Sequence, residues 1–404
     1  MVVAQDLIVK GKVVDAQTEK ALPFVNISVS GSTRGTTSDL NGRFSLRLKR
    51  PEEMLTFTYV GYEKLRATMT TNDTVVAMKP SPTKLSEVVI FPGKNPADSI
   101  MQAAAGRRKK NNPRNIPEYA YEMYNKTLVT VDDSVTFKLK ESQDTSDHKL
   151  GKHLEKHELL LTETYTENVY KKPGRLQENI VANRVSGLKN PAFYFLSTQV
   201  QPFSFYEDHI DLGGKKHLSP LSRNAHRDYL FILEDTVYRN EDTVFTIRFG
   251  PKANKKFAAL KGVISINTKG YAVENVRAQS AQDEKTPLSI NQKYQYIEGH
   301  WFPEQLNFDI EFVDLDFANA GSGLRMEGRS YIHNVVFDTN LRRRDFSAVS
   351  TRFKQGATEK SPEDWLLYRG GELSEKEQRT YTFTDSVGEE AKLDQKNGSH
   401  GIPD

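Results

Sequence analysis

The feature that most constrains the fold is the stretch at residues 34–44, which reads Arg-Gly-Thr-Thr-Ser-Asp-Leu-Asn-Gly-Arg-Phe. Asp39 and Asn41 have short polar side chains that can hydrogen-bond to the local backbone, and Gly42 readily adopts a positive φ. From residue 44 to residue 49, apolar and polar side chains alternate, which is the period of a strand with one buried face. The stretch therefore predicts a β-hairpin, which indicates a fold rather than a reaction.

Further short strands are predicted on both sides of this hairpin. Residues 7–14, 21–29, 54–60 and 74–78 carry alternating apolar side chains and are separated by turn-forming residues. Short strands at this spacing are typical of a small antiparallel β-sandwich.

The same region contains four sequence pieces that occur in this order in a known family. They are Gly-Lys-Val-Val-Asp at 11–15, Leu-Pro-Phe-Val-Asn-Ile at 22–27, the stretch at 35–44, and Tyr-Val-Gly-Tyr at 59–62. The region resembles the carboxypeptidase-regulatory-like domain, which is common at the N-terminus of outer-membrane proteins of Bacteroidota. The resemblance implies a seven-stranded Ig/transthyretin-like sandwich over residues 6–80. That domain accompanies some peptidases and is not the peptidase itself.

The rest of the chain is predicted to form a linker and a larger domain. Residues 81–94 are a linker with an extended segment that is similar to one following this sandwich in TonB-dependent transporters. A helix is expected after them, with Asn95 as its N-cap and Pro96 at its first position. Residues 141–151 are expected to be a loop and residues 157–169 mostly strand. Consecutive hairpins between residues 229 and 337 then predict a curved, half-barrel-like antiparallel sheet, so residues 95–340 form a mainly β domain with a few helices.

This second region also resembles a known family. The resemblance rests on the following pieces: Asn-Pro-Ala-Asp-Ser-Ile at 95–100, Asn-Asn-Pro at 111–113, Tyr-Ala-Tyr-Glu-Met-Tyr-Asn-Lys at 119–126, Asn-Arg-Val-Ser-Gly-Leu at 183–188, Gln-Pro-Phe-Ser-Phe-Tyr at 201–206, Leu-Lys-Gly at 260–262, and Trp-Phe-Pro-Glu-Gln-Leu at 301–306. They look like a Bacteroidota outer-membrane family of unknown function, whose members couple the sandwich to this domain and then to a C-terminal β-barrel. Residues 262–278 and 301–310 are also similar, more loosely, to the half-barrel of lipoprotein carriers.

The C-terminal residues depart from that family pattern. Residues 341–404 are mostly polar and show no succession of alternating strands of roughly ten residues, the signature of a membrane barrel. We therefore expect a polar tail there, and we expect the chain to be a periplasmic fragment or a truncated member of the family.

Composition excludes several classes of protein. The net charge is only +3, from 56 basic and 53 acidic residues, which argues against a dedicated nucleic-acid or anionic-membrane surface. The absence of cysteine excludes disulfides, thiolate nucleophiles and cysteine metal sites. No run approaches the roughly 18 apolar residues that a membrane-spanning helix needs.

One short segment resembles a metal motif, and two are basic. His153 and His157 flank Glu155, but a zincin helix needs its glutamate directly after the first histidine. A solvated edge is the favoured interpretation, and three ligands on one face of a strand is the alternative. The basic runs at 107–110 and 342–344 suit a helix C-terminus and a solvated linker, and contact with a phosphate or lipid headgroup is the alternative. We assign no catalytic, metal or cofactor site and expect no enzyme activity.

Aromatic residues are dense between residues 191 and 212, which suggests either an ordinary core or an apolar groove for a lipid or peptide. The groove would be lined by Phe193, Phe195, Phe203, Phe205, Tyr206, Phe231, Phe245, Ile264, Trp301 and Ile310.

Together, the two resemblances imply a non-enzymatic, periplasm-facing part of an outer-membrane protein that acts as a docking and ligand-binding module. Its partners would be other cell-envelope proteins or an apolar or lipid ligand, and membrane attachment would come from the family's barrel. The first alternative is a periplasmic lipid or lipoprotein carrier with an open apolar cavity. The second is an accessory protein of a glycan or peptide hydrolase.

Overall fold

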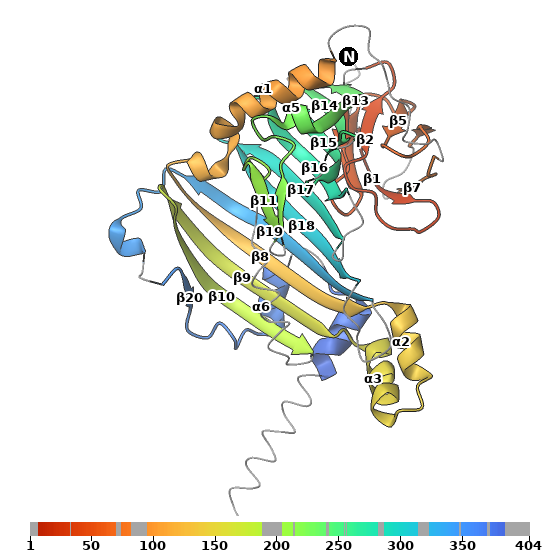
Figure 1. Cartoon of the computed structure of the whole chain (residues 1–404), viewed down its shortest axis with the longest axis vertical. Helices are drawn as coiled ribbons and strands as arrows, with labels where there is room; N and C mark the ends of the chain where they lie inside the picture. The colour runs from red at the N-terminus through yellow and green to blue at the C-terminus, as the bar shows by residue number, and fades with distance from the viewer. Residues whose placement is uncertain are drawn as a thin grey trace, which may run out of the picture. The chain divides into compact units, whose positions relative to one another are not determined.

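The computed structural model shows a mainly β protein with several short helices (Figure 1). The structure describes residues 7–32, 34–69, 74–81, 95–187, 204–212, 215–239, 242–253, 255, 257–281, 287–313, 323–346, 349–369 and 372–383. By their contacts the residues divide into two compact units. Unit 1 comprises Met1–Asn115, Phe203–Gln282 and Ile290–Gln305, and unit 2 comprises Ile116–Pro202, Asp283–Ser289 and Leu306–Asp404.

The predicted seven-stranded sandwich is confirmed in unit 1. One sheet has the order β4-β1-β7 and the other the order β3-β2-β5-β6. Val13, Ile27 and Phe57 are fully buried between the two sheets. The strands are β1 (Leu7–Asp15), β2 (Asn26–Val29), β3 (Gly35–Thr37), β4 (Arg43–Leu48), β5 (Met54–Thr58), β6 (Leu65–Thr68) and β7 (Thr74–Met78).

The turn at residues 39–42 is present, but the strands that it joins do not form the predicted hairpin. Asp39 Oδ1 accepts hydrogen bonds from the backbone N–H groups of Asn41 and Arg43 at 2.9 and 2.8 Å, and Gly42 has φ +74°. However, β3 pairs with β2, whereas β4 pairs with β1. The buried Ser38 hydroxyl binds the backbone of Leu22 and Val25, so the turn connects the two sheets of the sandwich.

A large open sheet contains most of the remaining strands. Among the described residues its order is β13-β14-β15-β16-β17-β18-β19-β8-β9-β10-β20. Strands β13 to β16 pair antiparallel in succession, as do β19, β8, β9 and β10, whereas β10 and β20 are parallel. This arrangement confirms the predicted fold class. The strands are β8 (Glu118–Val131), β9 (Leu160–Lys171), β10 (Arg175–Gly187), β13 (Tyr229–Tyr238), β14 (Thr243–Pro251), β15 (Leu260–Asn267), β16 (Ala272–Ser280), β17 (Leu288–Ile297), β18 (His300–Phe312), β19 (Leu324–Phe337) and β20 (Thr351–Phe353).

In unit 1 the predicted helix α1 (Pro96–Asn111) lies across β13 to β16 (Figure 1). Asn95 caps it by accepting a hydrogen bond from the Ala97 N–H at 3.0 Å, and Met101 and Ala104 are buried. Three smaller elements accompany it, namely β11 (His209–Leu212), β12 (Lys215–Leu218) and the one-turn helix α5 (Ala225–Asp228). The short helix η1 (Pro113–Asn115) follows α1.

In unit 2 the structure differs from the loop expected at residues 141–151. The helices α2 (Asp133–Lys140) and α3 (Thr145–Lys156) pack against each other. Asp144 caps α3 by accepting hydrogen bonds from two backbone N–H groups, and Gly151 allows the close approach, because a Cβ there would lie 2.5 Å from the Lys140 nitrogen. The polar composition of α3 concealed a helix whose stability depends on this packing and capping.

The segment expected as a polar tail contains ordered elements within its described part. These are η2 (Arg343–Asp345), β20, α6 (Pro362–Tyr368) and a helix at residues 375–383. Trp365 is 1% exposed and Tyr381 is 3% exposed, so these two buried aromatic side chains hold an otherwise polar segment against the rest of unit 2. Other apolar side chains remain on the surface, and Leu367 of α6 is 83% exposed.

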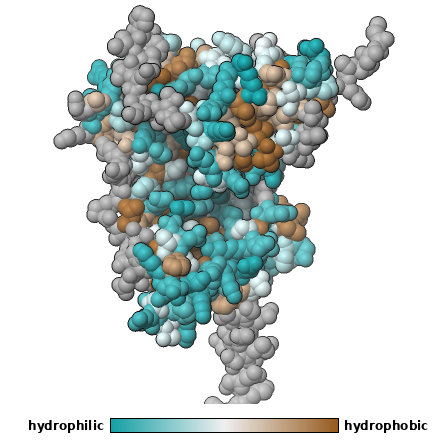
Figure 2. Space-filling model, turned by 90° about the vertical axis from the view of Figure 1, so that its right-hand side faces the viewer, coloured by the Kyte–Doolittle hydropathy of each residue, from teal (hydrophilic) through white to brown (hydrophobic). Residues whose placement is uncertain are grey.

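The surface shown in Figure 2 is mostly hydrophilic where it is coloured, and its hydrophobic residues gather in small patches. None of the described helices is both long and apolar enough to cross a membrane.

Candidate functional site

A polar pocket of about 280 Å³ lies within unit 1, where the sandwich meets the large sheet. The sandwich contributes Asn26 of β2, Thr58 at the end of β5, and Tyr59. The sheet contributes side chains from four neighbouring strands, β13 to β16. They include Asp235, Thr246, Val263, Ser265, Asn275 and Arg277.

Strand register explains why these sheet residues share one face. Thr246 of β14 pairs with Ser265 of β15, which in turn pairs with Asn275 of β16. Directly paired residues project to the same side of a sheet, so the three polar side chains form a row across three strands. Ser265 and Asn275 are each 3% exposed, and their side chains have no hydrogen-bond partner among the described residues. They therefore offer hydrogen-bonding groups to the pocket.

Asp235 joins the sandwich to the sheet. Its Oδ2 accepts hydrogen bonds from Asn26 Nδ2 at 3.0 Å and from the Thr58 hydroxyl at 2.6 Å. Asn26 Nδ2 also donates to the Thr246 hydroxyl at 3.0 Å. The register of β13 shifts between Leu233 and Asp235, and a bulge of this kind redirects a side chain out of the regular alternation.

Arg277 and Tyr59 make a second contact across the pocket. The guanidinium donates a hydrogen bond to the Tyr59 hydroxyl and also lies 4.2 Å from the centre of the ring. Burial raises the pKa of the Tyr59 phenol, although the Arg277 charge opposes this shift. The phenol therefore remains neutral and accepts the hydrogen bond from Arg277.

The charges that line the pocket balance, because Glu234 and Asp235 oppose Lys64 and Arg277. The pocket thus combines fixed hydrogen-bond donors and acceptors with little net charge. This arrangement suits the binding of a small polar molecule that is uncharged or zwitterionic.

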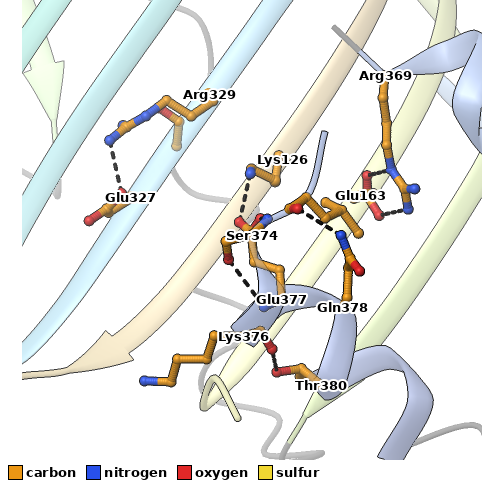
Figure 3. A network of polar contacts seen from close by, with 12 residues as sticks. Lys126, Glu163, Glu327, Arg329, Arg369, Ser374, Lys376, Glu377, Gln378 and Thr380 are labelled. Carbon is orange, nitrogen blue, oxygen red and sulfur yellow. Dashed lines mark hydrogen bonds and ion pairs between the residues drawn. The ribbon is translucent and has the colours of Figure 1, made fainter. Parts of the chain in front are cut away.

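A second polar cluster lies in unit 2, where the C-terminal segment covers β8, β9 and β10 (Figure 3). The fully buried Glu163 carboxylate accepts two hydrogen bonds from Arg369, both at 2.6 Å, and one from the Tyr124 hydroxyl at 2.6 Å. Burial on its own would raise the pKa of Glu163, but the hydrogen bonds from Arg369 and Tyr124 outweigh it and hold the pKa below its usual range.

Two further contacts attach the helix at residues 375–383 to the same unit. Lys126 Nζ lies 2.6 Å from Glu377 Oε1, and Lys376 Nζ lies 3.6 Å from Glu158 Oε2. Ser374 and Glu377 form a reciprocal cap at the start of this helix (Figure 3). The cluster has a structural role, because its charged groups are occupied in holding the segment on the sheet.

The predicted groove residues lie in several places. Phe193, Phe195 and Phe203 are outside the described residues. In unit 1, Phe205, Tyr206, Phe231, Ile264 and Trp301 are buried and Phe245 is half-buried, whereas Ile310 belongs to unit 2.

Several of the groove residues in unit 1 share a sheet face opposite to that of the polar pocket. Phe231 pairs with Phe249, and Ile264 pairs with Ile247, whereas Ser265, the next residue after Ile264, faces the pocket. The Trp301 indole donates to the Lys269 carbonyl at 2.8 Å. The structure therefore shows these side chains packed as core, and an open groove stays a prediction.

The histidine segment is helical and not the strand that the metal alternative required. His153 lies in α3 and His157 directly follows it, with their rings stacked 4.5 Å apart. Glu155 is engaged by Lys140 at 2.5 Å. Among the described residues no group of three candidate ligands could hold a metal ion.

Sequence reasoning did not single out the residues of the polar pocket. Ser265 and Asn275 share the pocket face of their strands with Val263 and Arg277, so polar and apolar residues mix on that face and the pattern along either strand does not distinguish the pair. A single polar residue in a strand more often faces solvent, so only the register between strands identifies the pair.

Comparisons with known proteins agree with this architecture. Residues 9–90 match the CarboxypepD_reg-like domain, and residues 100–326, more than half of the chain, match a family of unknown function, DUF5686. The TonB-dependent receptor P3 of Formosa agariphila is 33% identical over 90 residues, which are 22% of this chain and 9% of the receptor. The chain therefore matches a small part of that receptor.

Two solved structures show weaker similarity. A DUF1329 family protein from Desulfovibrio piger has a TM-score of 0.26 and 11% identity, covering 63% of this chain and 98% of its own. A putative membrane-associated protein of unknown function from Bacteroides fragilis has a TM-score of 0.15 and 9% identity, and the match covers 82% of this chain and 96% of that protein. These scores are too low to support an argument about function. The match over residues 100–326 decides the family, and this chain belongs to the family of unknown function DUF5686.

Proposed function

We propose that this chain is a non-enzymatic, periplasm-facing part of an outer-membrane protein and acts there as a docking and ligand-binding module. The observation that carries the proposal is the polar pocket to which both the sandwich and the large sheet contribute side chains. The sandwich is therefore part of a binding site and more than a spacer. The similarity to a TonB-dependent receptor supports the location in the cell envelope.

The chemistry of the pocket suits binding better than catalysis. Its most reactive group, the Asp235 carboxylate, already accepts hydrogen bonds from Asn26 and Thr58, and Arg277 is engaged with Tyr59. Among the described residues, the buried lining side chains of Ser265 and Asn275 have no protein partner, and both are neutral. A buried amide gains from a ligand that supplies its missing hydrogen bonds, which favours a small ligand rich in hydroxyl or amide groups.

Ligand binding can be tested by thermal unfolding of the full chain in the presence of defined probes. The probes are glucose, galactose, N-acetylglucosamine and glycylglycine at millimolar concentration. We expect at least one to raise the Tm, because a ligand that binds only the folded state stabilises it. The Asn275→Leu variant should lose this shift, whereas Gln279→Leu, which changes an exposed residue of the same strand, should retain it. A panel without effect on the unmodified protein would count against the pocket as a ligand site.

Location is tested separately, in cells that produce the protein. Antibodies should detect it in the outer-membrane fraction. A protease added outside should digest residues 1–404 only after the outer membrane has been permeabilised. Digestion in intact cells, or recovery in the cytoplasmic fraction, would overturn the assignment to the periplasmic face.

A further inference from the structure

A second pocket in unit 1, also of about 280 Å³, has a different character from the first. It lies between the second half of α1 and the segment that contains α5. Met101, Ala105, Pro220 and Phe231 provide apolar surface. Met101 and Phe231 are 2% and 1% exposed, so the apolar side of the pocket is continuous with the core.

The walls of this pocket are held in place by specific contacts. Asn95 caps α1 and also donates from Nδ2 to the Phe231 carbonyl at 2.8 Å, which fixes the start of the helix to β13. Near the other end, the Arg108 guanidinium pairs with Asp208, with Nη2 3.2 Å from Oδ2. The hydrogen bond from Arg108 lowers the pKa of Asp208, so this carboxylate stays ionised and the pair persists at neutral pH.

Cationic side chains line the polar side of the pocket. Lys109 and Arg108 come from the last turn of α1, and Arg223 comes from the segment before α5. No carboxylate is among the residues that line the pocket. In the part of the chain that the structure describes, Arg108 pairs with the Asp208 carboxylate, whereas Lys109 and Arg223 have no carboxylate partner. Lys109 and Arg223 thus leave about two positive charges beside an apolar wall. A basic helix C-terminus explains Lys109 alone, but it does not explain a cation on the opposite wall.

We propose that this pocket binds an amphipathic anion, a molecule with a phosphate head and one short alkyl chain. The head would lie between Lys109 and Arg223, which can both donate charge-assisted hydrogen bonds to it. The chain would lie against Ala105, over the buried side chains of Met101 and Phe231, where its own apolar surface is removed from water. The proposal rests on this pocket alone and does not depend on the function proposed for the polar pocket.

The direct test is isothermal titration of the full chain with three probes, each below its micelle concentration. Decyl phosphate carries both features, inorganic phosphate carries only the head, and decyl maltoside carries the same chain with a neutral head. We expect decyl phosphate to bind with one site per chain and at least about tenfold more tightly than either of the others. Equal affinity for inorganic phosphate would show that the apolar wall is not used, and equal affinity for decyl maltoside would show that the charge is not recognised. Either result, or no binding of decyl phosphate, would overturn the proposal.

Variants locate the binding. Lys109→Ala and Arg223→Ala should each weaken decyl phosphate about fivefold, the scale expected for one exposed ion pair. Lys110→Ala is the matched control, because Lys110 has the same charge in the same helical turn but does not line the pocket. An equal loss in the Lys110→Ala variant would reduce the effect to general attraction by the basic run and overturn the proposal.

The apolar wall has its own variant. Gly106 lines the pocket, and a Cβ built there meets no atom within 4 Å, so Gly106→Leu adds a side chain at the pocket without a backbone clash. Leucine is also a better helix former than glycine, so the variant should fold. We expect its affinity for decyl phosphate to fall by at least about tenfold. A folded Gly106→Leu variant that binds as tightly as the unmodified chain would contradict the proposed seat of the alkyl chain.

Discussion

Asp235 links the sandwich to the sheet through two side-chain hydrogen bonds. Replacing it with alanine removes the acceptor of the Asn26 amide and of the Thr58 hydroxyl at once. A buried donor left without its acceptor typically costs about 1–3 kcal/mol. We therefore expect Asp235→Ala to lower the free energy of unfolding by that amount, measured by urea denaturation. Asp235→Asn should cost less, because the amide oxygen can still accept one of the two hydrogen bonds.

Glu234 provides the control for this prediction. It is the adjacent residue, is exposed, and forms an ion pair with Arg248 on the same sheet. Exposed pairs of this kind contribute about 0–1 kcal/mol, so Glu234→Ala should change stability little. If both variants lost the same stability, the loss would reflect a general change of charge on β13 and not the specific hydrogen bonds of Asp235.

A larger effect is expected at the buried Glu163–Arg369 pair. Arg369→Met would leave the Glu163 carboxylate buried without its cationic partner, although Tyr124 would still donate to it, and breaking one half of a buried pair costs about 3–5 kcal/mol. Glu163→Gln combined with Arg369→Met removes both charges, so it should be less destabilised than Arg369→Met alone. A double-mutant cycle in denaturant measures this coupling. Additive losses would show that the two side chains do not act as a pair.

At the scale of elements, two glycines with opposite surroundings test the packing of unit 1. A Cβ on Gly262 of β15 would lie 2.0 Å from the Arg277 carbonyl oxygen, which is backbone of β16. Gly262→Ala should therefore cost about 1–3 kcal/mol or more, because the strands must separate. Gly106 of α1 has open space around its Cβ position, so Gly106→Ala should stabilise by roughly 0.5–1 kcal/mol. Urea midpoints of the two variants should shift in opposite directions, and a shift in the same direction would contradict this account.

The elements also show what sequence reasoning can and cannot reach. The sandwich strands and α1 were predictable because their signals are local, namely alternation, turn residues and the cap at Asn95. The pairing of β3 with β2 was not predictable, because the Ser38 contacts that direct the chain involve residues distant in sequence. The helix α3 and the C-terminal helix at residues 375–383 were missed because they are polar, and contacts elsewhere in the fold stabilise them. The polar pocket was missed because it depends on register across three strands.

At the scale of the whole molecule, the ionisable groups predict acid sensitivity. Hydrogen bonds hold the pKa values of several carboxyl groups below their usual range. The Tyr62 hydroxyl lowers that of Asp15 to about 2, and hydrogen bonds from basic residues lower those of Glu53, Glu118 and Asp208. A group with a lowered pKa in the folded state stabilises the protein above its ordinary pKa, and this contribution is lost as the pH falls through the folded value.

Two groups act in the opposite direction, because burial raises the pKa of the buried Glu158 and, in part, that of the half-buried Glu178. Their contribution is present at low pH and is lost as the pH rises through their folded pKa. More carboxyl groups are lowered than raised, so we expect the Tm to fall as the pH is reduced from 5 to 3. Glu163 is buried and its pKa is also lowered, so Glu163→Gln should flatten this decrease by removing one contribution to it. Calorimetric scans between pH 5 and pH 3 measure the slope of Tm against pH for the unmodified chain and for the Glu163→Gln variant. A Tm that rises towards pH 3 would contradict the predicted excess of carboxyl groups with lowered pKa values. A Glu163→Gln variant with an unchanged slope would show that Glu163 is not held ionised by Arg369 in the folded chain.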